Sequence, residues 1–150
     1  MQKQEFDEIL DFAVSREQEA VKFYQDLQNY ARFKDLNSML KGLESMEQGH
    51  IKVIENIRQN GVKEEDIKKV TNLKISDYLS VDIADLDMNY QNILVRAMKR
   101  EENSFMLYSE MSVKFPDPEI ATLFRRLAAD EAQHKLFFEG LYDDWLRTGN

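Results

Sequence analysis

Four long segments of the sequence carry apolar residues at three- and four-residue steps, the spacing of one face of an α-helix. They cover about residues 4–32, 35–60, 87–114 and 117–146. The 150 residues include only two prolines and five glycines, and Glu, Lys, Gln, Leu and Met are plentiful, so little interrupts long helices. Such helices must bury their apolar faces against one another. We therefore predict a single all-α domain over residues 1–150, built as a four-helix bundle.

Local signals mark the ends of these helices. Asp35 can cap the second helix, and Asn60-Gly61 can end it. Asp117 can cap the fourth helix, and Pro118 suits its first position. The connections before the second and fourth helices are short, which predicts two antiparallel hairpins.

The stretch 62–86 is too long for an ordinary turn between bundle helices. An extended linker of this length reaches ~80 Å, enough to cross a bundle whose helices are ~39 Å long. One long crossover between two helical hairpins resembles the connection of ferritin-like bundles. We also expect a short helical turn near residues 76–80.

The two halves of the sequence repeat each other. Shifting the second half by 84 positions aligns it without a gap to the first over residues 13–57. Four chemically specialised pairs coincide at this offset: Glu17 with Glu101, Tyr24 with Tyr108, Glu47 with Glu131, and His50 with His134. Helical periodicity alone explains matching apolar residues, but it does not explain these pairs. We therefore predict a duplicated hairpin with two-fold pseudo-symmetry.

Six residues of the repeat interrupt the apolar faces near the middle of their helices. They are the metal ligands that we predict: Glu17, Glu47, His50, Glu101, Glu131 and His134. Buried carboxylates are costly unless their charge is compensated. Two divalent cations would balance the four carboxylates.

The Glu-x-x-His spacing lets both side chains of a pair reach the same ion. The chain has no cysteine, so any metal must be held by carboxylate and imidazole, which suit iron or manganese, with zinc possible. A single Glu-x-x-His is usually just a solvated face, and a metal-free bundle with hydrogen-bonded core histidines is the alternative. Both histidines of the chain lie in this motif, in register with two further glutamates, which favours the metal site.

Three further residues are candidates for supporting roles. Tyr24 and Tyr108 follow Glu17 and Glu101 by two turns and would donate hydrogen bonds to ligands or quench radicals, unless they are ordinary core tyrosines. Asp130 can orient a ligand histidine through its other ring nitrogen.

At these motifs the sequence resembles the rubrerythrin branch of the ferritin-like di-iron carboxylate superfamily. The resemblance spans nearly the whole chain, and the Glu-x-x-Ala-x-x-x-Tyr run from Glu17 to Tyr24 is typical of the first rubrerythrin helix. It implies that one ion is held mainly by Glu17, Glu47 and His50 and the other by Glu101, Glu131 and His134. It also implies that Glu47 and Glu131 bridge the two ions.

Two departures from rubrerythrins are visible. The cysteine-rich rubredoxin-type domain is absent from these residues, and Ser104 stands where rubrerythrins place an additional glutamate ligand. The six-ligand pattern is similar to that of bacterioferritins. The resemblance implies a di-iron peroxidase or oxidase that reduces hydrogen peroxide or dioxygen in oxidative-stress defence and receives electrons from a separate donor protein such as a rubredoxin. The alternatives are a ferroxidase or iron-storage protein, and a non-catalytic metal-binding protein.

Composition excludes other classes of partner. The net charge of −8 argues against nucleic acid and anionic membranes as partners. No segment is long and apolar enough to span a membrane, and the N-terminus lacks the pattern of a signal peptide, so we expect a cytoplasmic protein. We also expect a homo-oligomer, a dimer.

Overall fold

The computed structural model describes residues 1–70, 73 and 89–148. Over these residues it is an all-α bundle without strands, so the predicted ferritin-like fold class is confirmed. Four long helices form the bundle: α1 (Lys3–Gln28), α2 (Asn37–Asn60), α4 (Tyr90–Lys114) and α5 (Pro118–Thr148).

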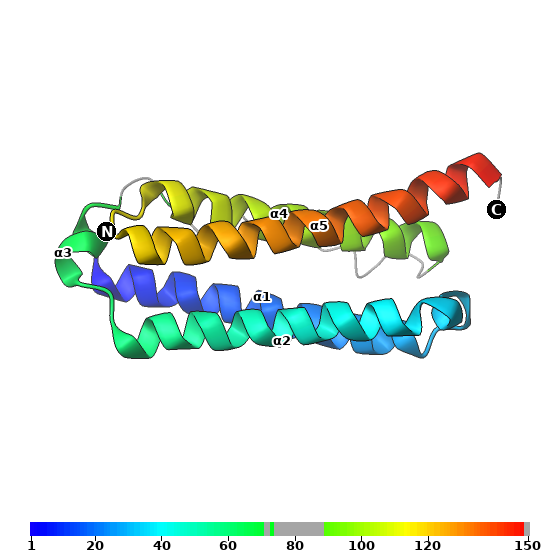
Figure 1. Cartoon of the computed structure of the whole chain (residues 1–150), viewed down its shortest axis with the longest axis horizontal. Coiled ribbons are helices and arrows are strands. Elements are labelled where there is room, and N and C mark those ends of the chain that lie inside the picture. The colour runs from blue at the N-terminus through cyan, green and yellow to red at the C-terminus, as the bar shows by residue number, and fades with distance from the viewer. Residues whose placement is uncertain (71–72, 74–88, 149–150) are drawn as a thin grey trace.

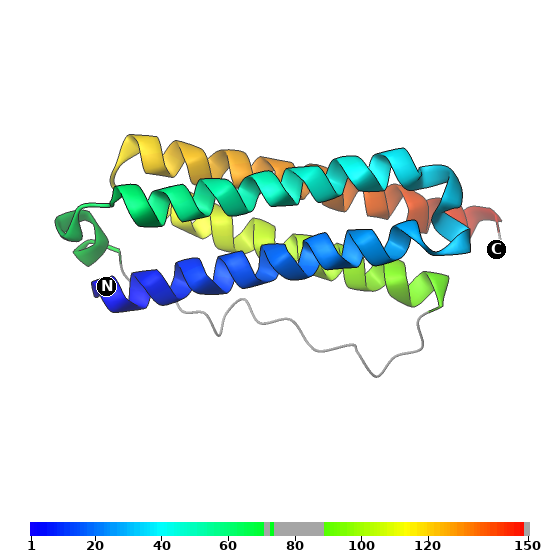
Figure 2. The same ribbon diagram turned by 90° about the horizontal axis from the view of Figure 1, so that it is seen from below.

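The helices pair as two antiparallel hairpins (Figures 1 and 2). α1 packs mainly against α2, and α4 packs mainly against α5, whereas backbones of different hairpins approach each other much less. Side chains therefore make most of the connection between the hairpins. None of the helices described here is both apolar enough and long enough to cross a membrane.

The apolar core consists of two clusters at different levels of the bundle. One includes Phe6, Leu10, Ile54, Met111 and Phe124, and the other includes Tyr24, Leu27, Leu40, Leu94 and Phe138. All four long helices contribute to both. The level between the two clusters is left to the polar residues that the sequence predicts as ligands.

Several predicted helix ends are confirmed. α2 ends at Asn60, and Gly61 adopts a φ of 88°, a conformation that glycine tolerates best. α5 begins at Pro118, and the carboxylate of Asp117 accepts a hydrogen bond of 2.9 Å from the backbone N–H of Glu119.

The end of the first helix and the cap of the second were predicted wrongly. α1 ends at Gln28 rather than near residue 32, and a 3₁₀ helix, η1 (Ala31–Leu36), precedes α2. The predicted cap Asp35 lies inside η1, and α2 begins without a side-chain cap. The physical reason is Phe33, which is fully buried in the second apolar cluster and takes the chain out of the α-helix to reach it.

The described part of the crossover contains a short helix that the sequence did not predict. A short helix, α3 (Glu64–Lys68), buries Ile67 against the first apolar cluster, and its acidic first turn complements the helix dipole. The N-terminal amino group of Met1 donates a hydrogen bond of 2.9 Å to the carbonyl of Val70. The helical turn predicted near residues 76–80 lies outside the described residues.

The predicted start of the third helix at Asp87 also lies outside the described residues. α4 begins at Tyr90, where the side chain of Asn89 accepts a hydrogen bond of 2.8 Å from the backbone N–H of Asn92. An asparagine cap is as favourable as the aspartate caps that the sequence suggested.

Phe33→Ala tests the importance of η1 for stability. Removing this fully buried ring should lower the free energy of unfolding by about 3–5 kcal/mol because it leaves a cavity in the second cluster. Urea unfolding of the metal-free protein followed by circular dichroism measures the loss. Lys34→Ala, an exposed neighbour, is the control and should change the free energy by about 0.5 kcal/mol or less. A similar small change for Phe33→Ala would contradict the packing described here.

Candidate metal centre

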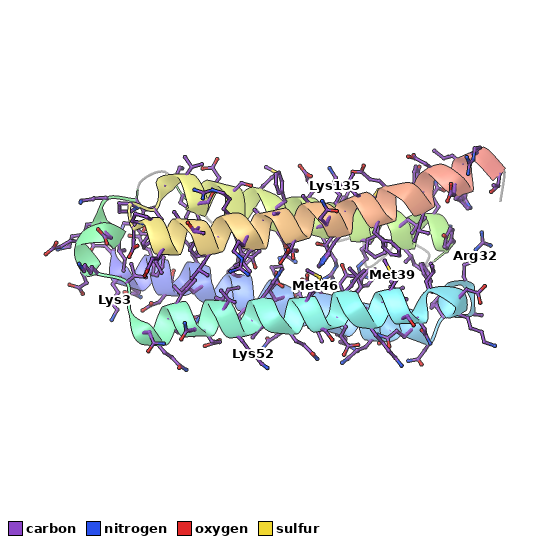
Figure 3. All side chains as sticks on the ribbon, in the orientation of Figure 1. Lys3, Arg32, Met39, Met46, Lys52 and Lys135 are labelled. Atoms are coloured by element: carbon purple, nitrogen blue, oxygen red, sulfur yellow. The ribbon has the colours of Figure 1, made fainter. Side chains whose placement is uncertain are left out.

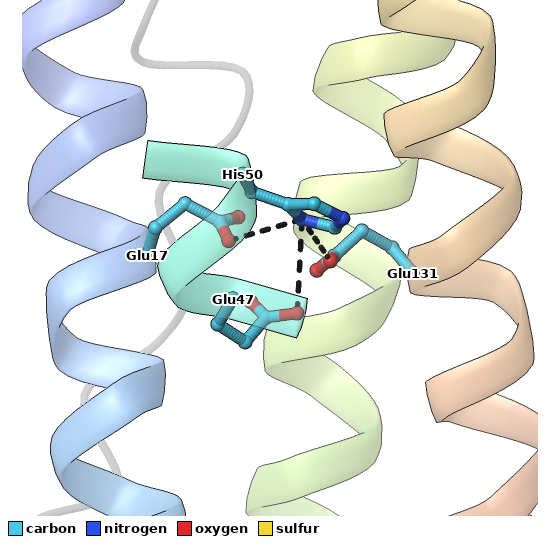
Figure 4. A group of neighbouring side chains, drawn as sticks. All are labelled: Glu17, Glu47, His50 and Glu131. Atoms are coloured by element: carbon cyan, nitrogen blue, oxygen red, sulfur yellow. Dashed lines mark hydrogen bonds and ion pairs between the residues drawn. The ribbon is translucent and has the colours of Figure 1, made fainter. Parts of the chain in front are cut away.

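The structure brings the six predicted ligands together between the two apolar clusters. α1 supplies Glu17, α2 supplies Glu47 and His50, α4 supplies Glu101, and α5 supplies Glu131 and His134. All six are buried, with at most 4% of their surface exposed. Figure 4 shows His50 projecting from α2 between the carboxylates of Glu17, Glu47 and Glu131. The helical repeat explains this meeting, since each residue replaces an apolar one on an inward face.

The six residues form two overlapping groups of potential ligands. One group is Glu17, Glu47, His50 and Glu131, and the other is Glu47, Glu101, Glu131 and His134. Within each group the ligand atoms lie within 4.8 Å of one another. Glu47 and Glu131 belong to both groups, which is the position of a carboxylate that bridges two ions. The remaining four residues belong to one group each.

Both histidines direct Nδ1 toward the carboxylates. Nδ1 of His50 lies 3.2 Å from Glu17 Oε2 and 3.0 Å from Glu131 Oε1. Nδ1 of His134 lies 3.0 Å from Glu47 Oε1 and 3.5 Å from Glu101 Oε2. The two imidazole rings are nearly parallel, at 9°, with centroids 6.3 Å apart. Each histidine therefore approaches carboxylates of both hairpins.

Several polar atoms of this cluster lack a hydrogen-bond partner among the described residues. They are both carboxylate oxygens of Glu47, one oxygen each of Glu101 and Glu131, and Nδ1 of His134. The close approach of His134 Nδ1 to Glu47 thus lacks the geometry of a hydrogen bond. Unpartnered buried acceptors are costly unless something else binds them. Carboxylate and imidazole ligands suit iron, manganese or zinc ions, and here they form two overlapping groups, so the residues fit a two-metal centre.

The carboxylates shared by both groups have perturbed acidities. Burial, followed by the charges of Glu17 and Glu101, raises the pKa of Glu47 well above its ordinary value. Burial also raises the pKa of Glu131, together with the charges of Glu101, Glu17 and Glu47. Without cations, these two carboxyl groups therefore tend to take up protons.

His50 is also perturbed. Burial opposes protonation of the imidazole, but the hydrogen bond and the charge of Glu17, with Glu47 and Asp130, outweigh it and raise the pKa to about 9. In the metal-free protein His50 is therefore a cation at neutral pH and compensates part of the negative charge of the cluster.

The two tyrosines predicted near the site bind across it. Tyr108 donates a hydrogen bond of 2.8 Å to Glu17, and Tyr24 donates one to Glu101. Each hydroxyl thus holds a carboxylate of the opposite half of the repeat. Burial, with the charge of the nearest carboxylate, raises the pKa of both tyrosines well above its ordinary value, which keeps the hydroxyls protonated as donors.

The outward nitrogens of the histidines have different partners. Nε2 of His50 lies 2.9 Å from Asp130 Oδ2, so Asp130 orients a histidine of the other hairpin. Nε2 of His134 lies 3.4 Å from the sulfur of Met46. Sequence analysis missed Met46 as a site residue, although its place in the repeat, 84 positions before Asp130, was a usable signal.

A cavity of about 20 Å³ reaches the centre between α1 and α4. Its lining includes two repeat pairs, Arg16 with Arg100 and Ala20 with Ser104, and two candidate ligands, Glu101 and Glu131. Arg100 also lies 3.5 Å from Glu19. The cavity has room for about one water-sized molecule. The sequence predicted no role for these two arginines.

The pH dependence of the metal-free protein follows from these shifts. The stabilisation that His50 contributes is complete below pH 6.5 and is lost as the pH rises through about 9. The stabilisation from protonated Glu47 and Glu131 is complete below pH 4.5 and is likewise lost as the pH rises through their raised pKa values. The melting temperature of the metal-free protein should therefore fall from about pH 5 to about pH 9.

Thermal unfolding in excess chelator measures this slope. The double variant Glu47→Gln, Glu131→Gln is the control and should show a flatter dependence. With saturating manganese(II) the decline should shrink, because protons compete with the metal for these ligands. A melting temperature that rises over this range in chelator would contradict the assignment.

The overlap of the two groups predicts different effects of the glutamates on metal binding. Glu47→Ala or Glu131→Ala should weaken both metal positions, because each carboxylate belongs to both groups. Glu17→Ala or Glu101→Ala should mainly weaken one position. Titration of the metal-free variants with manganese(II) measures the number and affinity of the sites. If Glu47→Ala keeps one tight ion while Glu17→Ala loses both, the roles are reversed.

Comparison with known protein families finds a similarity over part of the chain. The rubrerythrin family model matches residues 92–148, which span nearly all of α4 and the whole of α5. Neither the curated proteins nor the solved structures contain a significant match to the chain. The matched hairpin carries Glu101, Glu131 and His134, and the buried cluster fits a di-iron protein. The second hairpin, α4 and α5, is therefore similar to the rubrerythrin family.

Proposed function

We propose that this protein is a di-iron oxidoreductase that reduces hydrogen peroxide or dioxygen and is re-reduced by a separate electron-donor protein such as a rubredoxin. The observation that carries the proposal is the pair of overlapping ligand groups with two shared carboxylates, Glu47 and Glu131. Two iron ions bound there would supply two electrons to one oxidant molecule. A role in oxidative-stress defence, the cytoplasmic location and the homodimer stay predictions from the sequence.

Neighbouring tyrosines fix the orientation of the two carboxylates that belong to one ligand group each, Glu17 and Glu101. Tyr108 and Tyr24 each bind one carboxylate, of Glu17 and Glu101 respectively. This leaves the unpartnered oxygen of Glu101 free to face the centre. Side chains whose orientation is fixed before binding lose less entropy when they ligate an ion.

The surroundings of the cluster also limit what can react there. Apolar side chains lie on both sides of it along the bundle, and the six candidate ligands are almost fully buried. The cavity beside Glu101 and Glu131 holds about one water-sized molecule. This size suits dioxygen or hydrogen peroxide and argues against an organic substrate. Arg16 and Arg100 line the same cavity and place positive charge beside it.

Electrons for a second turnover must come from outside these 150 residues. The sequence contains no cysteine, so it has neither a rubredoxin-type iron site nor a redox-active thiol. A separate donor protein therefore fits the proposal.

Peroxide consumption by the iron-loaded protein tests the function. Reconstituted protein should hold about two iron ions per chain. After anaerobic reduction and mixing with peroxide in a stopped-flow instrument, about two ferrous ions should be oxidised per peroxide, with two protons taken up and two waters formed. Glu8→Gln, an exposed glutamate of α1, is the control and should react like the wild type. Glu131→Ala should lose most of the fast reaction.

Other outcomes would favour the alternatives. Continued oxidation of ferrous iron far beyond two ions per chain, with the product leaving the site, would indicate a ferroxidase or storage protein. Iron that binds but reacts with peroxide no faster than free iron would indicate a non-catalytic binding protein. Protein that binds no iron would refute the centre itself.

A further inference from the structure

The two histidines are held alike on the inside of the cluster and differently on its outside. Both direct Nδ1 toward the carboxylates and Nε2 toward the opposite hairpin. His50 Nε2 meets a carboxylate oxygen of Asp130 at 2.9 Å, whereas His134 Nε2 meets the thioether sulfur of Met46 at 3.4 Å. The difference between the halves lies in the chemistry of these two partners.

Asp130 and Met46 occupy equivalent places. Each immediately precedes the glutamate of a Glu-x-x-His motif, and each contacts the histidine of the other motif. Both residues are partly exposed to solvent. Figure 3 shows Met46 between α2 and α5.

A carboxylate and a thioether act differently on an imidazole. An N–H donor bound to a carboxylate makes a short, charge-assisted hydrogen bond, which fixes the ring and increases the electron density at the other nitrogen. A thioether sulfur is only a weak acceptor and carries no charge. His50 is thus the better-oriented and more basic ligand, and Asp130 adds negative charge near its metal position.

We propose that the two metal positions are unequal, with the position of His50 filling before the position of His134 because Asp130 rather than Met46 supports its histidine. The proposal rests on the two-metal centre proposed above. Partners of this kind typically change metal affinity by about 10–100-fold, and we expect a difference in that range. Asp130 and Met46 are positioning residues, since each acts on the ion through a histidine.

Variants with one histidine each isolate the two positions. His134→Ala keeps the position of His50, and His50→Ala keeps the position of His134. Anaerobic titration of the metal-free variants with iron(II) by calorimetry should give a dissociation constant about 10–100-fold lower for His134→Ala. Equal dissociation constants would overturn the proposal while leaving the two-metal centre intact.

Exchanging the outer partners tests the cause. In the His134→Ala background, Asp130→Met should weaken iron(II) binding by about 10–100-fold, and Asp130→Asn, which keeps an acceptor without charge, should weaken it less. In the His50→Ala background, Met46→Asp should strengthen binding, whereas Met46→Leu is the matched control and should change it little. No effect of Asp130→Met would overturn the role of Asp130.

The wild-type protein offers a readout that does not depend on the variants folding. At half saturation with ⁵⁷Fe(II), Mössbauer spectroscopy should show one dominant ferrous doublet, and a second should grow only as the second equivalent is added. Two doublets of equal area from the first addition would overturn the unequal filling. Failure of the wild type to bind any iron(II) would overturn the proposed centre as well, so the two failures are distinguishable.

Discussion

Four carboxylates buried at one level of a helical bundle are the constraint on which the rest of this structure depends. Their mutual repulsion and loss of hydration would destabilise the fold unless positive charge or protons compensate them. The metal-free protein does this with protons, through the raised pKa values of Glu47, Glu131 and His50. Two divalent ions would achieve the same neutrality. Apolar burial is therefore divided into a cluster on either side of this level.

The sequence predicted the six residues that meet at this level because each interrupts an apolar face near the middle of its helix. It did not predict which residues would touch. Tyr24 lies two turns, about 10 Å, from Glu17 on the same helix and donates to Glu101 instead. Periodicity identifies the buried face of a helix, but it does not identify which residues of the neighbouring helices pack against that face. The same holds for the contact of Asp130 with His50.

The errors at helix ends have a related origin. Asp35 is a residue type that commonly caps helices, but burial of Phe33 decides where α2 begins. A local propensity worth about 1 kcal/mol gives way to a buried aromatic ring worth several times more. The described part of the crossover shows the same effect, since α3 places Ile67 in the core. A local sequence pattern does not show which side chains will be buried against distant parts of the chain.

The crossed contacts have a consequence for the repeat. Each ligand group draws side chains from both hairpins, so one hairpin alone would carry three of the four residues of one group and only one of the other. Two copies of one hairpin could complete the set by pairing, but symmetry would then oblige both copies to carry the same residue beside each histidine. When the two hairpins belong to one chain, the residues beside the two histidines can differ. The linkage also raises the effective concentration of one hairpin for the other. Covalent fusion thus allows an aspartate at one position and a methionine at the equivalent position of the repeat, so that a pseudo-symmetric bundle can offer two unequal metal positions.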